Sequence, residues 1–361
     1  MRQQLPDFPW DALAPYAEKA RTYPDGSIDL SQGTPVDPTP EFIQEALRNN
    51  SNSPRYPLTA GTPELREAIS LWAKKNLGAT GDFDVLPVIG SKEVIAWLPT
   101  FLQSNKVLYP DIAYPTYLVG AMLAQATPVA VGLNAHEWPQ AQLAFINSPS
   151  NPTGRVHSES EMRAAISWAR KNESPLVSDE CYLEFGDSAI PTSILSYSEG
   201  DNKNILAVHS LSKRSSMAGY RAAFLVGDSN LIAKIREVRK HAGMMVPLPV
   251  QHAMVSALGD QEHVTAQRIR YNSRRAKLVP ALIAAGFRID ESAAGLYIWC
   301  TRQEDAWKSV DWLASLGILA TPGSFYGALG HSHIRIAMTA TDEDIDRAVH
   351  RILSSLHSLE N

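Results

Sequence analysis

Apolar residues recur at helical spacing in the first quarter of the chain. Between residues 65 and 72 they return every three or four positions, directly after Thr62-Pro63. Thr62 suits the N-cap because its hydroxyl can accept a backbone N–H, and Pro63 suits the first turn because no N–H is needed there. Thr39-Pro40 opens a shorter amphipathic segment in the same way. The pattern therefore predicts a helix after each Thr-Pro pair.

Seven short apolar runs follow, separated by stretches of helical character. The runs are Val85–Ile89, Lys106–Tyr109, Pro128–Val131, Leu143–Ile146, Leu176–Ser178, Ile205–Val208 and Ala222–Val226. Such alternation is typical of βα units, in which helices cover both faces of the sheet. We expect an α/β fold with a large domain built on a mostly parallel, seven-stranded sheet flanked by helices.

From about Leu231 onward the pattern becomes more helical. A hairpin-like patch at Gly295–Cys300 and a late strand at His333–Met338 predict a smaller α+β domain. The N-terminal segment is too short to fold alone and is expected to join this domain. The predicted boundaries are 41–245 for the large domain, with 1–40 and 246–361 forming the small one.

Composition and charge exclude several classes of protein. At 361 residues the chain is long enough for two domains, and 44% hydrophobic with 20% charged residues is ordinary for a globular protein. A net charge of −5 offers no basic face to nucleic acid and no polybasic membrane anchor. The histidines show no metal-ligand spacing, so no metal is expected.

Cysteine use and the absence of long apolar runs indicate a cytoplasmic protein. Cys181 and Cys300 are the only cysteines and form no CxxC pair, which argues against a disulfide scaffold or zinc ribbon and fits a reducing compartment. No run approaches the roughly 18 apolar residues of a membrane-spanning helix. The N-terminus also lacks the apolar core of a signal peptide.

The segment from Ser210 to Arg221 carries the most informative chemistry. Lys213 stands three residues after Ser210 and eight before Arg221, directly after a strand-like run. A lysine amine can form a Schiff base with pyridoxal phosphate (PLP), while a serine hydroxyl and a guanidinium bind phosphate oxygens. Taken alone, the segment is equally compatible with a basic surface loop.

Other polar residues follow strand ends, where open α/β sheets bind ligands. Asp179 can keep a pyridine nitrogen protonated, and Tyr182 and Asn151 can reach the 3-oxygen of PLP. Tyr114 can stack on a planar ring. A helix cap, a plain turn and a core aromatic are the ordinary alternatives for these positions.

Two further positions suit anionic groups. Gly90 leads through Ser91 and Lys92 into a helix, and free N–H groups at a helix N-terminus suit a phosphate. Arg335 lies in an alternating strand and can bind a carboxylate bidentately if it faces a pocket. An ordinary strand–helix turn and a solvated surface arginine are the alternatives.

Together these residues resemble the class I and II aminotransferases of PLP fold type I, over nearly the whole chain. The resemblance runs in order from Gly33 to Arg335. It implies that Lys213 forms the Schiff base and that Asp179 and Tyr182 serve catalysis beside it. The implied phosphate ligands are Ser91, Lys92, Ser210 and Arg221, the 3-oxygen ligands Tyr182 and Asn151, and the stacking aromatic Tyr114.

The same resemblance implies how substrates and a second subunit are held. Arg335, with Asn151, would bind the α-carboxylate of amino acid and oxo acid substrates, and Gly33 would lie where the N-terminal segment covers them. Tyr56 would reach the phosphate in the partner subunit, which implies a homodimer with shared sites.

Arg214, after the lysine, departs from the small residue common in relatives. The form Ser-Lys-Arg-Ser-x-x-Ala-Gly-Tyr-Arg resembles the short N-succinyldiaminopimelate aminotransferases of lysine biosynthesis. This implies transamination between glutamate and N-succinyl-2-amino-6-oxopimelate, with Lys213 moving the proton at the substrate α-carbon. Charge alone makes Arg214, Arg155 and Arg21 candidates for the distal anionic groups of that substrate.

Several alternatives share part of this pattern. An aspartate, aromatic or histidinol-phosphate aminotransferase and a PLP-dependent C–S β-lyase share the fold and cofactor residues, because function lies in the substrate pocket. An S-x-x-K acyl-transfer enzyme would also need S-D-N and K-T-G strings, which do not occur here. A PLP-binding regulator would need a DNA-binding module ahead of Gly33, where only about thirty residues stand.

Overall fold

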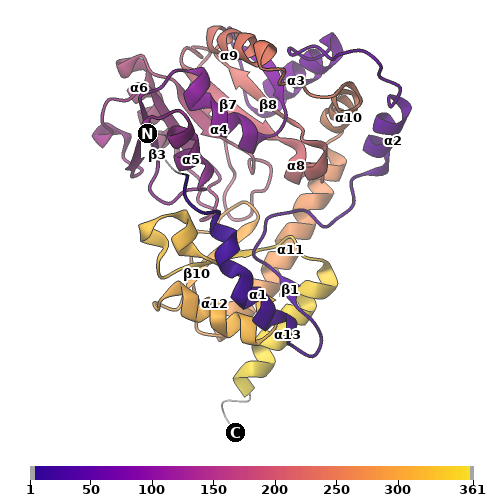
Figure 1. Ribbon diagram of the computed structural model, residues 1–361, viewed down its shortest axis with the longest axis vertical. Coiled ribbons are helices and arrows are strands. Elements are labelled where there is room, and N and C mark those ends of the chain that lie inside the picture. The colour runs from indigo at the N-terminus through magenta and orange to yellow at the C-terminus, as the bar shows by residue number, and fades with distance from the viewer. Residues whose placement is uncertain (1–4, 358–361) are drawn as a thin grey trace.

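The seven apolar runs form one sheet, which the computed structural model, describing residues 5–357, places in the upper part of the molecule (Figure 1). Its strands are β2 (Asp84–Val88), β3 (Lys106–Pro110), β4 (Thr127–Val131), β5 (Leu143–Asn147), β6 (Leu176–Asp179), β7 (Ile205–Ser210) and β8 (Ala223–Gly227). They stand in the order β2-β8-β7-β6-β5-β3-β4, and of these seven strands β8 alone runs in the direction opposite to the other six. The predicted mostly parallel, seven-stranded sheet is confirmed.

Both faces of this sheet are buried because consecutive strand residues are apolar and point to opposite sides. In β5, Leu143 and Phe145 pack on the face covered by α4, α5 and α9, while Ala144 and Ile146 pack on the face covered by α2, α3, α6, α7 and α10. These helices are α2 (Glu41–Asn49), α3 (Pro63–Asn76), α4 (Ser91–Phe101), α5 (Thr116–Leu123), α6 (Glu159–Asn172), α7 (Ile194–Tyr197), α9 (Ser229–His241) and α10 (Leu248–Gly259).

The two Thr-Pro pairs start their helices differently. The hydroxyl of Thr62 accepts the N–H of Leu65 at 3.2 Å, so α3 begins with the expected cap. Thr39 does not cap α2, which begins at Glu41. Its hydroxyl instead donates to the carbonyl of Ser216 at 2.6 Å, because the loop after the lysine segment packs against it.

A second, antiparallel sheet of four strands lies in the lower part of the molecule. Its order is β12 (Thr321–Pro322), β13 (Ile334–Ala337), β10 (Tyr297–Thr301) and β9 (Arg288–Asp290). Around it lie α11 (Glu262–Ala284), α12 (Ala306–Ser315) and α13 (Asp342–His357). Figure 1 shows α11 running from the upper part into the lower part. The late strand predicted at His333–Met338 is β13.

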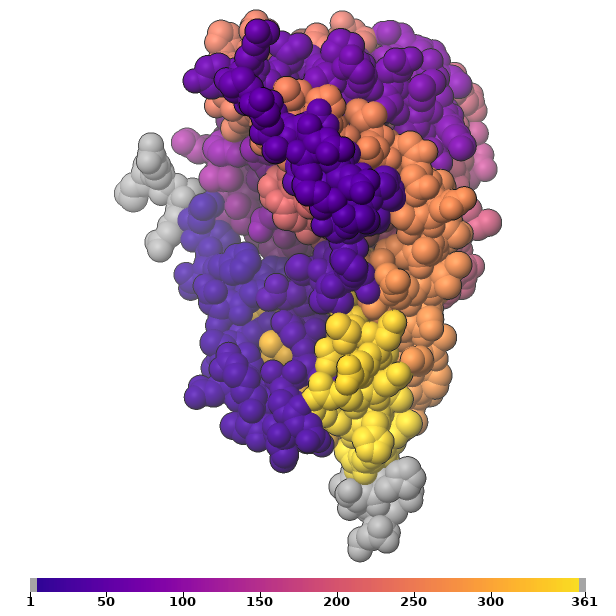
Figure 2. Space-filling view, turned by 90° about the vertical axis from the view of Figure 1, so that its right-hand side faces the viewer, coloured from indigo at the N-terminus to yellow at the C-terminus, as the bar shows by residue number. Residues whose placement is uncertain are grey.

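The N-terminal segment belongs with this lower part. After α1 (Ala14–Arg21), β1 (Ile28–Asp29) pairs in parallel with β11 (Ile318–Leu319), and Leu13 is buried in the same apolar core. Figure 2 shows the indigo N-terminal segment beside the yellow C-terminal helix.

The apolar cores bear on where the two domains divide. Ala253 and Met254 of α10 share a core with Ile43 of α2, whereas Tyr271 and Leu278 of α11 belong to the lower core. We therefore propose a boundary between α10 and α11, later than the boundary expected after residue 245.

None of the helices within the described residues is long and apolar enough to cross a membrane.

Candidate active site

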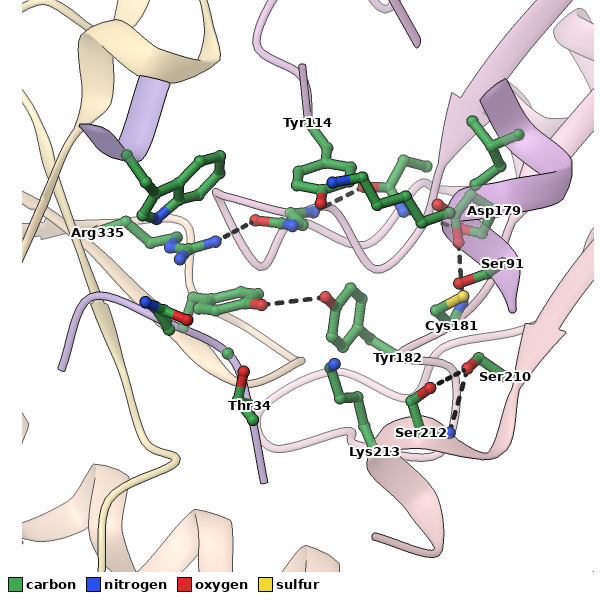
Figure 3. Close-up of a pocket in the computed structure, with 18 of the residues that line it drawn as sticks. Thr34, Ser91, Tyr114, Asp179, Cys181, Tyr182, Ser210, Ser212, Lys213 and Arg335 are labelled. Atoms are coloured by element: carbon green, nitrogen blue, oxygen red, sulfur yellow. Dashed lines mark hydrogen bonds between the residues drawn. The ribbon is translucent and has the colours of Figure 1, made fainter. Parts of the chain in front are cut away.

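A cavity of about 290 Å³ lies where the carboxyl edge of the large sheet faces the lower part of the molecule. Eleven of the twelve predicted site residues line it: Gly33, Ser91, Lys92, Tyr114, Asn151, Asp179, Tyr182, Ser210, Lys213, Arg221 and Arg335. Tyr56 is the exception, because its side chain is 94% exposed and lies outside the cavity. Figure 3 shows Lys213, Tyr182 and Arg335 pointing toward the same space.

Lys213 lies on α8 (Leu211–Arg214), a single helical turn that follows β7 directly. Ser210 caps this turn: its hydroxyl oxygen accepts the N–H of Ser212 at 3.1 Å and donates to the Ser212 hydroxyl at 2.9 Å. The pKa of Lys213 is lowered from 10.5 to about 8, chiefly by burial and also by the charges of Arg221 and Arg335, against an opposing effect of Cys181. An amine with this pKa is poised to act as a base near neutral pH.

This pKa predicts a pH-dependent stability of the cofactor-free protein. Below pH 8 the folded protein holds a buried ammonium, which destabilises it, and the cost vanishes as pH rises from 8 to 10.5, where only the unfolded state remains protonated. Lys213→Met should therefore raise the free energy of unfolding by about 1–3 kcal/mol at pH 7 and by less at pH 10. Denaturant unfolding at both values tests this, with the exposed Lys203→Met as control. An equal gain at both values would contradict it.

The turn before α4 and the guanidinium of Arg221 form a concave cradle. Gly90 has a φ of +115°, and a Cβ there would stand 2.1 Å from the Nη2 of Arg221, so only glycine fits. Arg221 is held by a bond from its Nη1 to the carbonyl of Ala218 at 2.8 Å. Ser91 then begins α4, whose first N–H groups have no helical acceptors. A phosphate would meet positive charge and free N–H donors in this cradle.

Asp179 is a buried carboxylate at the end of β6. Its Oδ2 accepts the hydroxyl of Tyr117 at 2.8 Å and its Oδ1 accepts the N–H of Cys181 at 3.2 Å. Burial raises the pKa of Asp179, although these hydrogen bonds act in the opposite direction. A buried carboxylate is kept ionised most readily by a cationic partner, and a protonated pyridine nitrogen is such a partner.

The Asn151 loop is fixed by Asn147 and reaches the lower part of the molecule. The side-chain oxygen of Asn147 accepts the N–H of Asn151 at 2.7 Å, and its amide donates to the carbonyl of Asp179 at 2.9 Å. Asn151 in turn accepts Nη1 of Arg335 at 2.9 Å. Nη2 of Arg335 donates to the carbonyl of Ser31. Arg335 therefore faces the cavity and not the solvent.

Two tyrosines, Tyr182 and Tyr297, lie beside Arg335 in the cavity. The hydroxyls of Tyr182 and Tyr297 lie 3.0 Å apart, and the guanidinium of Arg335 lies 4.0 Å from the centre of the Tyr297 ring. Burial raises the pKa of Tyr182 well above its usual value, so its phenol stays protonated near neutral pH. A Cβ on Gly33 would lie 2.0 Å from the Tyr297 hydroxyl, which explains the glycine at that position.

Aromatic side chains and one lysine line another part of the cavity. The ammonium of Lys92 lies 5.4 Å from the centre of the Phe8 ring and 5.8 Å from that of Tyr114. Trp10 meets the Tyr114 ring edge-on at 6.4 Å between centroids. Among the described residues no carboxylate pairs with Lys92, so a cation is free to meet a ligand here.

The structure corrects the sequence-based choice of cations for a distal substrate group. Arg214 is buried against Glu184, Arg155 pairs with Glu161 at 2.7 Å, and Arg21 does not line the cavity. The sequence analysis also missed Tyr117, Asn147 and Tyr297 as supporting residues. Tyr117 follows Tyr114 by three residues and Asn147 ends a strand, so their positions were visible, but their partners lie elsewhere in the chain.

The residues present fit PLP. A glycine cradle beside an arginine suits the phosphate, a buried carboxylate suits the ring nitrogen, and the Lys213 amine, whose pKa burial lowers, suits a Schiff base. We propose the implied roles for these residues, with Tyr182 and Asn151 near the 3-oxygen and Tyr114 on the ring face.

Comparisons with known proteins show the family to which the chain belongs. A family model described as aminotransferase class I and II matches residues 25–352. The chain is 52% identical over 356 residues to a probable aminotransferase of Mycobacterium tuberculosis, which covers 96% of this chain and 85% of that protein. It is 49% identical over 358 residues to the 4-dedimethylamino-4-oxo-anhydrotetracycline transaminase OxyQ of Streptomyces rimosus, covering 97% and 99%.

A solved structure is similar over its whole length. The probable N-succinyldiaminopimelate aminotransferase of Thermus thermophilus superposes with a TM-score of 0.88 at 26% identity, covering 96% of this chain and 99% of that one. The chain therefore belongs to the class I and II aminotransferases, a PLP-dependent family that acts on amino acids and oxo acids.

Proposed function

We propose that this aminotransferase transfers the amino group of glutamate to N-succinyl-2-amino-6-oxopimelate, giving N-succinyl-LL-diaminopimelate for lysine biosynthesis. The observation that carries the proposal is the pair of cations that line the cavity from its two sides. Arg335 comes from β13 of the lower part, and Lys92 comes from α4 of the upper part. A substrate with an α-carboxylate and a distal carboxylate can contact both.

Arg335 suits the α-carboxylate because its guanidinium is oriented before any ligand arrives. Asn151, the carbonyl of Ser31 and the Tyr297 ring hold it from three directions. A planar guanidinium fixed in this way loses little side-chain entropy when it binds a carboxylate. The resemblance implies a phosphate contact for Lys92, but we assign it to the distal carboxylate instead. Its ammonium lies by the Phe8 and Tyr114 rings, which hold it without neutralising it.

The chain's own residues then account for the proton transfers. When bound, PLP supplies an electron sink for negative charge that develops at the substrate α-carbon. Lys213 removes the proton from that carbon and returns one at the cofactor carbon, since its lowered pKa leaves part of its amine neutral near pH 7. Asp179 holds the proton on the ring nitrogen, with Tyr117 fixing the orientation of its carboxylate.

The similarity to the Thermus thermophilus protein supports this substrate, because that protein is named a probable N-succinyldiaminopimelate aminotransferase.

A second candidate substrate is suggested by the aromatic side chains that line the cavity. Phe8, Trp10 and Tyr114 suit a flat polycyclic ketone as well as an aliphatic chain. The 49% identity to the tetracycline transaminase OxyQ favours testing such a ketone as acceptor.

We further propose a homodimer in which Tyr56 contacts the partner's site. Members of the family are typically dimeric, and Tyr56 and Leu58 are exposed, at 94% and 62%, in a segment outside the chain's own cavity.

A cytoplasmic location is also proposed, supported by the two free cysteines, Cys181 and Cys300.

A half-reaction measured by absorbance tests the proposed substrate. The PLP-loaded protein is mixed separately with glutamate, N-succinyl-LL-diaminopimelate, aspartate, histidinol phosphate or cystathionine. Fast conversion to the amine form of the cofactor is expected with the first two only. Faster conversion by aspartate or histidinol phosphate, or pyruvate release from cystathionine, would replace the proposed substrate.

Lys92→Ala sharpens this test. It should lower kcat/KM for N-succinyl-LL-diaminopimelate about 10- to 150-fold, because a charged hydrogen bond contributes roughly 1.5–3 kcal/mol. The rate with the neutral donor 2-aminohexanoate should stay unchanged, and Lys92→Arg should restore most of the loss. An equal loss on both donors would instead place the effect of Lys92 at the cofactor.

A further inference from the structure

Arg214, the residue after Lys213, points away from the cavity into a buried ion pair. Its side chain is 4% exposed, and its Nε lies 2.7 Å from Oε2 of Glu184. The guanidinium carbon lies 5.2 Å from the centre of the Trp72 ring. None of its three guanidinium nitrogens makes a hydrogen bond to the described residues, so the contact with Glu184 is an ion pair without a hydrogen bond. This arginine is therefore fixed by one carboxylate and one aromatic face.

The ion pair joins the segments that carry two proposed active-site side chains. Arg214 ends the turn α8 that carries Lys213, while Glu184 stands two residues after Tyr182. The other carboxylate oxygen of Glu184 accepts the side-chain amide of Gln261 at 2.9 Å, and Gln261 precedes α11. The Lys213 turn, the Tyr182 turn and the start of α11 thus meet at one junction, in which Arg214 is buried, Glu184 half-buried and Gln261 exposed.

Ser215 supplies a second tie between α8 and α11. Its hydroxyl lies 2.8 Å from Nε2 of His263, and Nδ1 of His263 contacts Oδ1 of Asp260. The sequence Ser–His–Asp of hydrogen bonds is that of hydrolytic triads. Ser215 is only 1% exposed, however, so its hydroxyl cannot reach an external acyl group. The chain of bonds fixes position and leaves no room for a nucleophilic role.

We propose that Arg214 and Ser215 are positioning residues. By anchoring α8 to the Glu184 turn and to the start of α11, they fix the position of Lys213 relative to Tyr182. A four-residue turn has almost no stability of its own, so tertiary contacts set where its lysine points. The anchoring helix α11 is itself held in place further along its length. Arg275 of α11 donates to the carbonyls of Ser292, Gly295 and Tyr297 at 2.7 to 3.3 Å.

The test removes the ion pair without leaving one charge unpaired. Arg214→Met/Glu184→Met keeps two side chains of similar volume, and a buried pair can often be replaced in this way with little loss of stability. We expect kcat to fall at least tenfold with KM for glutamate changed less than threefold, since a small misplacement of a catalytic group acts on the chemical step. Arg214→Lys, which keeps only the charge, should restore part of kcat.

A second measurement on the same variants, the pH dependence of cofactor absorbance, needs no substrate. The pH midpoint of the absorbance change of the lysine-bound cofactor should rise in Arg214→Met, which leaves Glu184 negative, and fall in Glu184→Gln, which leaves Arg214 positive. His263→Leu, which removes the ring nitrogen beside the Ser215 hydroxyl, should lower kcat less than the ion-pair variants do. Because the midpoint is measured without amino acid, failure of the proposed succinyl substrate leaves this test intact.

Arg351→Met serves as the matched control. Arg351 is a buried arginine of the lower part, whose Nη1 donates to the carbonyl of Gly26 at 2.9 Å, so its loss should lower Tm without moving the pH midpoint. A double variant with kcat within twofold of the wild type, or single variants that lower Tm but leave the midpoint unchanged, would overturn the proposal. If the double variant does not fold, Glu184→Gln alone decides between these results.

Discussion

Replacing Lys213 with alanine is expected to lower the transamination rate at least 1000-fold, on the order of the loss of a general acid–base group. The variant loses both the amine that holds the cofactor covalently and the base beside the substrate α-carbon. The cradle of Gly90, Ser91 and Arg221 remains intact, so part of the cofactor should still bind. Single-turnover kinetics with glutamate would measure the first effect, and cofactor absorbance after gel filtration the second.

Borohydride trapping gives this prediction a control. In the wild type, reduction should attach the cofactor to the peptide that contains Lys213, and mass spectrometry should find no label in Lys213→Ala. Lys203→Ala removes an exposed lysine shortly before the same strand, β7, and should behave as wild type. Label on another lysine, or full activity in Lys213→Ala, would overturn the assignment of the site.

Asp179→Asn is expected to slow the same half-reaction at least about 100-fold, the usual cost of removing one oriented electrostatic contact in an active site. The amide cannot hold the proton on the ring nitrogen, although it keeps the size of the carboxylate. Tyr117 and the N–H of Cys181 donate to different oxygens of Asp179, and the amide keeps one of these two acceptors, so the fold should survive.

The comparison for Asp179→Asn is Asp84→Asn. Asp84 begins β2 and pairs with Arg66 at 3.2 Å and Arg236 at 3.0 Å, away from the cavity. Its loss should affect stability slightly and leave the rate unchanged. If Asp179→Asn retained the wild-type rate and the wild-type absorbance band, another residue would have to carry the pyridine nitrogen.

The sequence predicted the sheet because the information is local. Each strand is a short apolar run and each connection a helical one, so period and length suffice. The same holds for residues at strand ends, such as Asp179 and Lys213, because parallel strands bring their carboxyl ends to one edge. The cradle was foreseeable in part, since Gly90 leads into a helix.

Contacts between distant segments could not be predicted in this way. Tyr297 lies in a strand of the second sheet, and it contacts Tyr182 only because the fold brings that strand to the edge of the first sheet. Phe8 contacts Lys92 although more than eighty residues separate them in sequence. Arg214 shows the opposite failure. Its charge suggested a substrate contact, but the direction of its side chain is set by Glu184 and Trp72, and neither is near it in sequence.

The placement of Phe8 and Trp10 separates what the enzyme selects from what it catalyses. Both line the cavity, yet they precede α1 and contribute no strand to the large sheet that carries Asp179 and Lys213. Substitutions in this opening segment can therefore alter which acceptor is admitted while the proton-transfer machinery stays unchanged. In a lineage of duplicated genes, such a segment is a ready place for new substrate ranges to arise. In the laboratory, it is also the part of the chain where a fused tag would disturb selectivity before it disturbed chemistry.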